Sequence, residues 1–289
     1  MNKQVVFNDL VKTAMAQSNR AHMRPVIEKE LLHYDILFAL DQANLLDQIT
    51  FQGGTALRLC YGAQRFSEDL DFAGGTQFKA RNLAQIKQCL ESYLGERYGL
   101  AVTVKEPKIS DNSEKNVNVH KWQLSVTTAP KRKDLPRQCI KIEVANVPAY
   151  TKEPHALQRN YDFLPDGYND TLVFTESINE IMADKLISFV CATRKIRHRD
   201  IWDLRWLKEK GAVVDKTLVN QKIKDYHISN YANLLEKRIE SLEGIIHGKA
   251  FLAEMSRFLD ADVQARTLQK EKFLVFLTNE IKVLLLLLV

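Results

Sequence analysis

Two aspartates separated by a single leucine, Asp69 and Asp71, constrain this chain more than any other feature. They close the stretch FQGGTALRLCYGAQRFSEDLDF, residues 51–72. In an extended strand alternate side chains lie on one face, so a strand here would place both carboxylates on the same side. Two carboxylates so close together repel each other unless positive charge lies between them. A divalent metal ion is the usual source of that charge, so the pair is a candidate metal site.

The same stretch begins with a Gly-Gly-Thr turn made by Gly53, Gly54 and Thr55, which follows a short strand-like run, QITFQ. Such a turn at the start of a helix exposes backbone N–H groups beside the positive end of the helix dipole, which suits phosphate. A lone Gly-Gly or Asp-x-Asp is common. The order of the segments carries the interpretation: strand, Gly-Gly-Thr, short helix, Arg-Phe-Ser and then Asp-Leu-Asp-Phe.

A third carboxylate follows in CIKIEVANV, residues 139–147, where apolar residues alternate with Lys141 and Glu143. The alternation predicts a strand with Glu143 on its polar face. If this strand neighbours the one that holds the aspartates, three carboxylates converge on one face of a sheet. Oxygen ligands of this kind suit Mg²⁺ or Mn²⁺, and two such ions would bridge a triphosphate.

The pattern along the chain predicts an α+β fold, with a small mixed sheet and flanking helices followed by a mainly helical C-terminal half. We expect an α/β domain over residues 1–172. Residues 173–289 are expected to form a helical domain that closes the cleft. The expected helices of the first part are 24–46, 55–62 and 77–99, and residues 148–171 are expected to be an irregular connection. The expected strands are 48–52, 68–75, 100–106, 119–128, 138–147 and 171–176.

The composition, with 289 residues and a formal net charge of +5, is typical of a globular protein and compatible with a nucleic-acid or nucleotide partner. The four cysteines lack C-x-x-C spacing, which indicates reduced thiols and a cytoplasmic location. The terminal run KVLLLLLV is far shorter than a membrane span. It is interpreted as a helix packed into a core or a subunit contact, with membrane association as the alternative.

The helical part begins with SINEIMADKLISFVCATRKIRHRDIWDLRWL, residues 177–207. Lys185 lies along an apolar stripe, four residues from both Ile181 and Phe189, where lysine is rare without a partner. Either its stem carries the ammonium out to water, or the ammonium pairs with triphosphate oxygens at a cleft.

A cluster of basic residues follows Lys185, at Arg194, Lys195, Arg197 and Arg199. It is either a solvated helix end or a contact for nucleotide phosphates or an RNA backbone. Asp200 and Asp203 are three residues apart and lie on one helical face. Either they form ion pairs with these arginines, or they have a role in the active site.

The order of the motifs in residues 51–72 resembles the nucleotidyltransferase superfamily. More narrowly, it resembles the AbiEii/AbiGii type of abortive-infection toxin, over about Arg24 to Leu207. The resemblance implies a metal site at Asp69, Asp71 and Glu143 (relatives often carry Asp at the third position). It also implies phosphate binding by Gly53, Gly54, Thr55, Arg65, Ser67 and Lys185, and an active-site role for Asp200, with a weaker case for Asp203.

The resemblance implies an enzyme that moves a nucleoside monophosphate from an NTP to an acceptor hydroxyl and releases pyrophosphate. It also implies the toxin of a bacterial toxin–antitoxin pair, with a cognate antitoxin as partner. Some relatives modify tRNA 3′ ends, which makes tRNA the preferred acceptor. The alternatives are a small-molecule or protein acceptor, or a catalytically silent module that binds RNA or protein.

Overall fold

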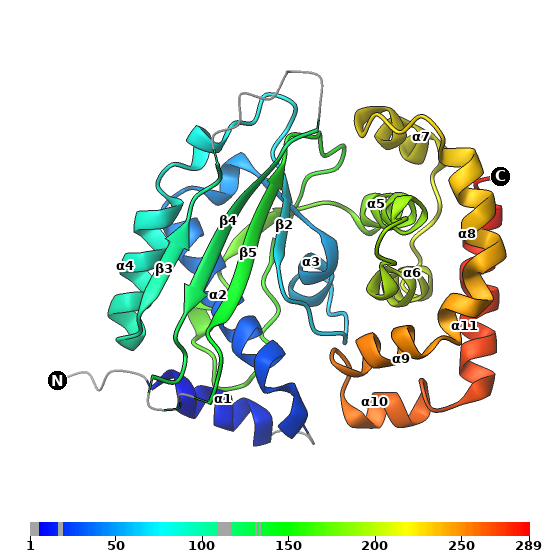
Figure 1. The fold of residues 1–289 in the computed structure, drawn as a ribbon. Helices are drawn as coiled ribbons and strands as arrows, with labels where there is room; N and C mark the ends of the chain where they lie inside the picture. The colour runs from blue at the N-terminus through cyan, green and yellow to red at the C-terminus, as the bar shows by residue number, and fades with distance from the viewer. Residues whose placement is uncertain (1–5, 17–19, 109–116, 131, 133) are drawn as a thin grey trace. The chain divides into compact units, whose positions relative to one another are not determined.

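The computed structural model of the protein describes residues 6–16, 20–108, 117–130, 132 and 134–289. The chain divides into two compact units, Met1–Glu176 and Ser177–Val289 (Figure 1). The mixed α/β class with a helical second half is confirmed. The assignment of domains to 1–172 and 173–289, with a role for each, stays a prediction.

The first unit contains a mixed sheet which, within the described residues, has the order β3-β4-β5-β2-β1-β7-β6. Two pairs of neighbours are parallel, β2 with β5 and β1 with β7, and the others are antiparallel. The strands are β1 (Thr50–Gln52), β2 (Leu70–Ala73), β3 (Val102–Lys105), β4 (Val119–Val126), β5 (Gln138–Ala145), β6 (Glu153–Ala156) and β7 (Leu172–Thr175).

Helices α2 and α4 cover the apolar face of this sheet, since α2 packs on β5 and α4 on β3. The alternation predicted for β5 is confirmed, because Ile140, Ile142 and Val144 are fully buried. The helices of the unit are α1 (Phe7–Ala16), α2 (Arg24–Gln42), α3 (Gly53–Leu59) and α4 (Ile86–Tyr98), with short 3₁₀ turns at Ala21–Met23, Leu46–Gln48, Ala80–Leu83 and Asp166–Tyr168.

Three expectations about the first unit are corrected. The connection 148–171 is not wholly irregular, because it holds the short edge strand β6. The helix expected over 77–99 divides into a 3₁₀ turn and α4, which ends at the left-handed Gly99. The helix expected over 24–46 ends at Gln42, just before Asn44 turns the backbone with a φ of 55°.

The second unit, all of whose residues are described, is helical. Its first helix begins at Ser177, whose hydroxyl accepts a hydrogen bond from the backbone N–H of Glu180. None of the helices in the described part of the chain has the length and apolar composition needed to cross a lipid bilayer. The helices are α5 (Ile178–Cys191), α6 (His198–Glu209), α7 (Lys216–Asp225), α8 (Tyr231–Ile246), α9 (Lys249–Ser256), α10 (Ala261–Arg266) and α11 (Glu271–Leu286).

Candidate active site

The Gly-Gly-Thr motif forms the first turn of α3, directly after β1, and brings the backbone of Gly53 against the Asp71 carboxylate. Gly53 has a φ of +78°, which side-chain-bearing residues rarely adopt, and a Cβ atom there would lie 2.9 Å from Asp71 Oδ2. Thr55 fixes the other side of the turn, because its hydroxyl donates a hydrogen bond to the Asp69 carbonyl. The turn and the acidic segment are therefore one local structure.

Gly54 faces the Arg-Phe-Ser part of the motif. A Cβ at Gly54 would lie 2.4 Å from an Arg65 Nη atom and 3.1 Å from Ser67 Oγ. Arg65 is 2% exposed, and its guanidinium donates to the Phe66 carbonyl at 2.6 Å. A buried guanidinium thus lies directly behind the turn and contributes positive charge there.

Asp71 and Glu143 lie at the same level of two neighbouring parallel strands. In the β2–β5 pair Asp71 is the register partner of Glu143, and in the β1–β2 pair it is the partner of Gln52. Register partners on adjacent strands lie about 4.8 Å apart and point to the same face. Two of the three carboxylates that the sequence analysis placed on one face therefore belong to one row across the sheet.

Asp69 lies just before β2, which begins at Leu70, so the expectation that it belongs to the strand is corrected. Its carboxylate accepts a hydrogen bond from the backbone N–H of Lys141 on β5, at 3.0 Å, and lies 3.6 Å from the Lys141 ammonium. The Lys121 ammonium of β4 lies 2.7 Å from Glu143 Oε1. Two lysines thus compensate two of the three carboxylates.

Helix α2 holds the acidic segment through residues that the sequence analysis did not single out. The Lys29 ammonium lies 2.9 Å from Glu68 Oε1, and His33 Nε2 lies 3.0 Å from the Glu68 carbonyl oxygen. Burial lowers the pKa of His33 to about 4, so its imidazole is neutral at physiological pH. Lys29 and His33 are four residues apart, so they lie on one face of α2, and this spacing in the sequence indicates a shared partner.

In the second unit, Lys185 does not extend into water, because its side chain is only 12% exposed. Its ammonium lies 2.7 Å from Asp200 Oδ1 and 3.0 Å from Asp203 Oδ2. The Ser188 hydroxyl, which the sequence analysis missed, donates to Asp200 Oδ2 at 2.6 Å. The structure therefore joins Lys185 to both aspartates.

The predicted basic cluster lies in the loop between α5 and α6 and at the start of α6. Arg194, Lys195 and Arg197 are exposed. Arg199 is engaged, with its guanidinium 3.6 Å from Glu254 Oε1 and 4.7 Å from the centre of the Phe258 ring. Three of the four predicted basic residues are thus accessible to a partner.

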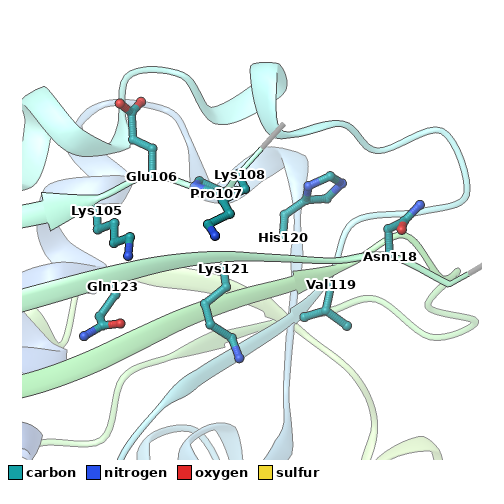
Figure 2. A pocket seen from close by; sticks show the side chains of 9 residues that line it. All are labelled: Lys105, Glu106, Pro107, Lys108, Asn118, Val119, His120, Lys121 and Gln123. Atoms are coloured by element: carbon teal, nitrogen blue, oxygen red, sulfur yellow. The ribbon is translucent and has the colours of Figure 1, made fainter. Parts of the chain in front are cut away.

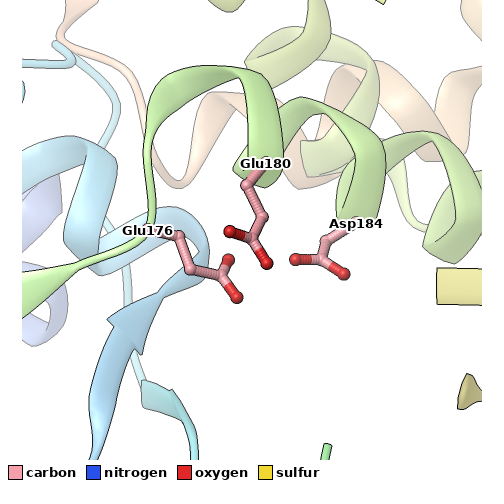
Figure 3. A group of neighbouring side chains, drawn as sticks. All are labelled: Glu176, Glu180 and Asp184. Atoms are coloured by element: carbon pink, nitrogen blue, oxygen red, sulfur yellow. The ribbon is translucent and has the colours of Figure 1, made fainter. Parts of the chain in front are cut away.

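A separate acidic cluster is formed by Glu176, Glu180 and Asp184, which follow one another every four residues (Figure 3). Among the described residues, this is the trio whose ligand oxygens all lie within 4.8 Å of one another. The ammonium of Lys222 lies 2.8 Å from Glu180 Oε1 and 2.7 Å from Asp184 Oδ2, and Lys222 is 1% exposed. A buried lysine therefore pairs with two of the three carboxylates, and we interpret this contact as an ion-paired connection between α5 and α7.

The donor set at Asp69, Asp71 and Glu143 fits a hard divalent cation. It consists of carboxylate oxygens on the partly exposed face of a sheet, and Mg²⁺ takes one or two carboxylates together with water and substrate phosphates. Lys121 and Lys141, whose side chains are about half exposed, are the counter-charges of Glu143 and Asp69.

A mixed sheet with a Gly-Gly-Thr turn and carboxylates in one row of neighbouring parallel strands is the arrangement expected of a nucleotidyltransferase. Residues 35–279 match the model of the family "Nucleotidyl transferase AbiEii toxin, Type IV TA system". The chain belongs to this family of toxin nucleotidyltransferases, and the resemblance seen in the sequence is confirmed.

Solved structures share the fold. MenT4, a nucleotidyltransferase toxin from Mycobacterium tuberculosis, is 18% identical, with 98% of this chain and 99% of that chain covered at a TM-score of 0.53. JHP933 from Helicobacter pylori is 19% identical, with 91% of this chain and 93% of that chain covered at a TM-score of 0.51. No curated protein sequence matches the chain.

Proposed function

We propose that the protein transfers a nucleoside monophosphate from an NTP to an acceptor hydroxyl, with a divalent metal as cofactor. The acceptor oxygen forms a bond to the α-phosphorus, the bond to the β-phosphate breaks, and pyrophosphate leaves. The observation that carries the proposal is the row of Asp71 and Glu143 on neighbouring parallel strands, next to the backbone of Gly53.

The residues of the first unit have separate roles in this proposal. Asp69, Asp71 and Glu143 would hold the Mg²⁺ or Mn²⁺, and Glu143 would accept the proton of the acceptor hydroxyl. When bound, the metal would neutralise phosphate charge and lower the pKa of the acceptor hydroxyl. Gly53, Gly54 and Thr55 let the backbone approach a phosphate, while Arg65 and Ser67 lie behind the turn and brace it.

Lys185 and Asp200 remain candidates for nucleotide binding in the second unit. The pairing of Lys185 with Asp200 and Asp203 holds the ammonium in one orientation, which suits a residue that must meet a triphosphate. Asp200 would then act as a positioning residue for Lys185, and Ser188 would hold Asp200.

The preferred acceptor is the 3′ end of a tRNA, and the biological role is that of a cytoplasmic toxin restrained by a cognate antitoxin. The membership of a type IV toxin–antitoxin family supports the toxin role. The exposed Arg194, Lys195 and Arg197 support an RNA acceptor, because basic side chains bind the phosphate backbone.

Calorimetry with each NTP, with and without Mg²⁺, tests the proposal together with an assay for released pyrophosphate. We expect metal-dependent binding of at least one NTP, and pyrophosphate release that falls about 10²-fold or more in Asp71→Asn. Binding and release that proceed equally in the presence of a chelator would contradict the metal-dependent mechanism. An intact fold without any NTP binding would instead favour a silent binding module.

A further inference from the structure

A basic groove lies beside the carboxylate row in the first unit. It is a cavity of about 290 Å³ between the chain that leaves β3 and the first residues of β4 (Figure 2). Its charged lining residues are Lys105, Glu106, Lys108 and Lys121, so three lysines against one glutamate give a formal charge of +2. Burial lowers the pKa of the other titratable lining residue, His120, which therefore adds no charge at neutral pH.

The groove is continuous with the proposed catalytic residues through Lys121. This lysine lines the groove and places its ammonium 2.7 Å from Glu143 Oε1. Along β4, Lys121 and His120 are neighbours and point to opposite sides (Figure 2), so Lys121 shares the face of Glu143 and Asp71. The positive charge of the groove thus begins where the carboxylate row ends.

A second row of side chains runs parallel to the first. Lys105 of β3 is the register partner of Gln123 on β4, and Gln123 is the partner of Lys141 on β5. Lys141 in turn lies next to Asp69. Since adjacent strands are about 4.8 Å apart, the two lysines lie on either side of Gln123, with their backbones about twice that distance from each other. The row therefore places a lysine on each side of Gln123, from Lys141 beside Asp69 to Lys105 on β3.

The chemistry of this surface fits a chain of phosphates. Lysine ammonium groups are point charges that bind phosphate without reading bases, and the Lys121 side chain is about half exposed. The acceptor hydroxyl must lie at the carboxylates. The phosphates that precede it in a nucleic-acid strand must then lie on the surface next to them.

We propose that Lys105, Lys108 and Lys121 form a phosphate-binding groove that holds the RNA acceptor strand behind its reacting 3′ end. This inference rests on the proposed function, because it assumes an RNA acceptor. Phosphate could also come from the NTP, so the experiment has one arm for each source.

The first arm measures the affinity for purified tRNA by fluorescence anisotropy over a series of salt concentrations. The variants are Lys105→Ala and the double variant Lys105→Ala/Lys108→Ala. The matched control is Lys87→Ala, which removes an exposed lysine from α4, on the other side of the sheet. We expect weaker tRNA binding, and a slope of log affinity against log salt that is lower by about 1 for each groove lysine. The control should keep the slope of the unaltered protein.

The second arm measures NTP binding by calorimetry in Mg²⁺, and we expect all these variants to bind as the unaltered protein does. Unchanged tRNA slopes in the groove variants, or an equal loss in Lys87→Ala, would overturn the inference. Loss of NTP binding with tRNA binding intact would also overturn it and assign the groove to the triphosphate. If the unaltered protein binds NTP but no tRNA, the RNA acceptor itself is wrong and the inference falls with it.

Discussion

At the scale of single residues, Gly54 shows how closely the backbone of the turn packs against a neighbouring side chain in the candidate site. Its backbone φ is not in the left-handed region, so alanine is allowed by conformation, but the added methyl would meet the guanidinium of buried Arg65. Glycine is therefore favoured here by the close approach of Arg65, and not by the backbone conformation. By contrast, a Cβ at Gly244 within α8 would meet no atom within 4 Å.

Gly54→Ala should therefore displace Arg65 and the turn that it braces. Because a shift of about 1 Å in a positioned group can cost about 10²-fold in rate, we expect a loss of that order in pyrophosphate release. Gly244→Ala, the matched control, should keep full activity and gain up to about 1 kcal/mol of stability. A fully active Gly54→Ala enzyme would show that the contact between the turn and Arg65 does not matter for the reaction.

His33 gives the protein a specific pH dependence of stability. Its folded pKa of about 4 lies below the ordinary value of 6.5, so the unfolded state binds a proton more readily between these values. The contribution of neutral His33 is complete above pH 6.5 and is lost as the pH falls towards 4. Linkage makes this loss about 2 kcal/mol between pH 7.5 and pH 5.

Urea unfolding at these two pH values, on the unaltered protein and on His33→Gln, measures the contribution. The unaltered protein should lose about 2 kcal/mol more on acidification than the variant does. Equal losses in both proteins would contradict a buried neutral imidazole at this position.

At the scale of elements, α3 is joined to α2 by a buried ion pair. The Arg58 guanidinium donates to both Glu30 oxygens, at 2.8 and 3.1 Å, and also to the carbonyls of Ala63 and Gln64. It also lies 4.4 Å from the centre of the Phe66 ring. The same arginine thus fixes α3 and the chain that leads to Asp69 and Asp71.

Arg58→Ala would leave the Glu30 carboxylate buried without its guanidinium. Such a loss costs about 3–5 kcal/mol, and we expect a decrease of that size in the free energy of unfolding. The double variant Arg58→Met/Glu30→Leu should regain much of it, because it buries no unpaired charge. If the double variant were as unstable as the single one, the pair would be essential for reasons other than charge.

Lys185 and Lys222 allow a matched test of the second unit. Each is a buried or nearly buried lysine of this unit paired with two carboxylates. Lys185→Met and Lys222→Met should both destabilise the fold by about 3–5 kcal/mol. At a temperature where both remain folded, only Lys185→Met should weaken NTP binding in calorimetry. Equal NTP affinity in the two variants would leave Lys185 with a structural role alone.

The elements of the chain were predictable where the periodicity was strong and local. The alternation in β5 and the glycines of the β1–α3 turn identify their elements from the sequence alone. The strand β6, Glu153–Ala156, was not predictable, because it contains Pro154 and shows no alternating burial. Proline is tolerated there because β6 is an edge strand, a property of the whole sheet.

The candidate site was predictable to a similar degree. Lys141 precedes Glu143 by two residues, and the alternation in the sequence predicted that both lie on the polar face of the strand. The pairing of Lys121 with Glu143 could not, because it depends on the register of β4 against β5. The partnership of Lys185 with Asp200 and Asp203 likewise depends on the packing of α6 against α5.

At the scale of the whole molecule, we propose that this toxin-family enzyme transfers nucleotides to RNA. The most direct measurement incubates the protein and Mg²⁺ or Mn²⁺ with total bacterial RNA and each α-labelled NTP, beside an Asp71→Asn control. We predict label in a tRNA-sized band, dependent on the metal and on Asp71. Metal-dependent NTP binding without label in any RNA would contradict the RNA acceptor, and label of equal strength in the Asp71→Asn reaction would contradict the proposed active site.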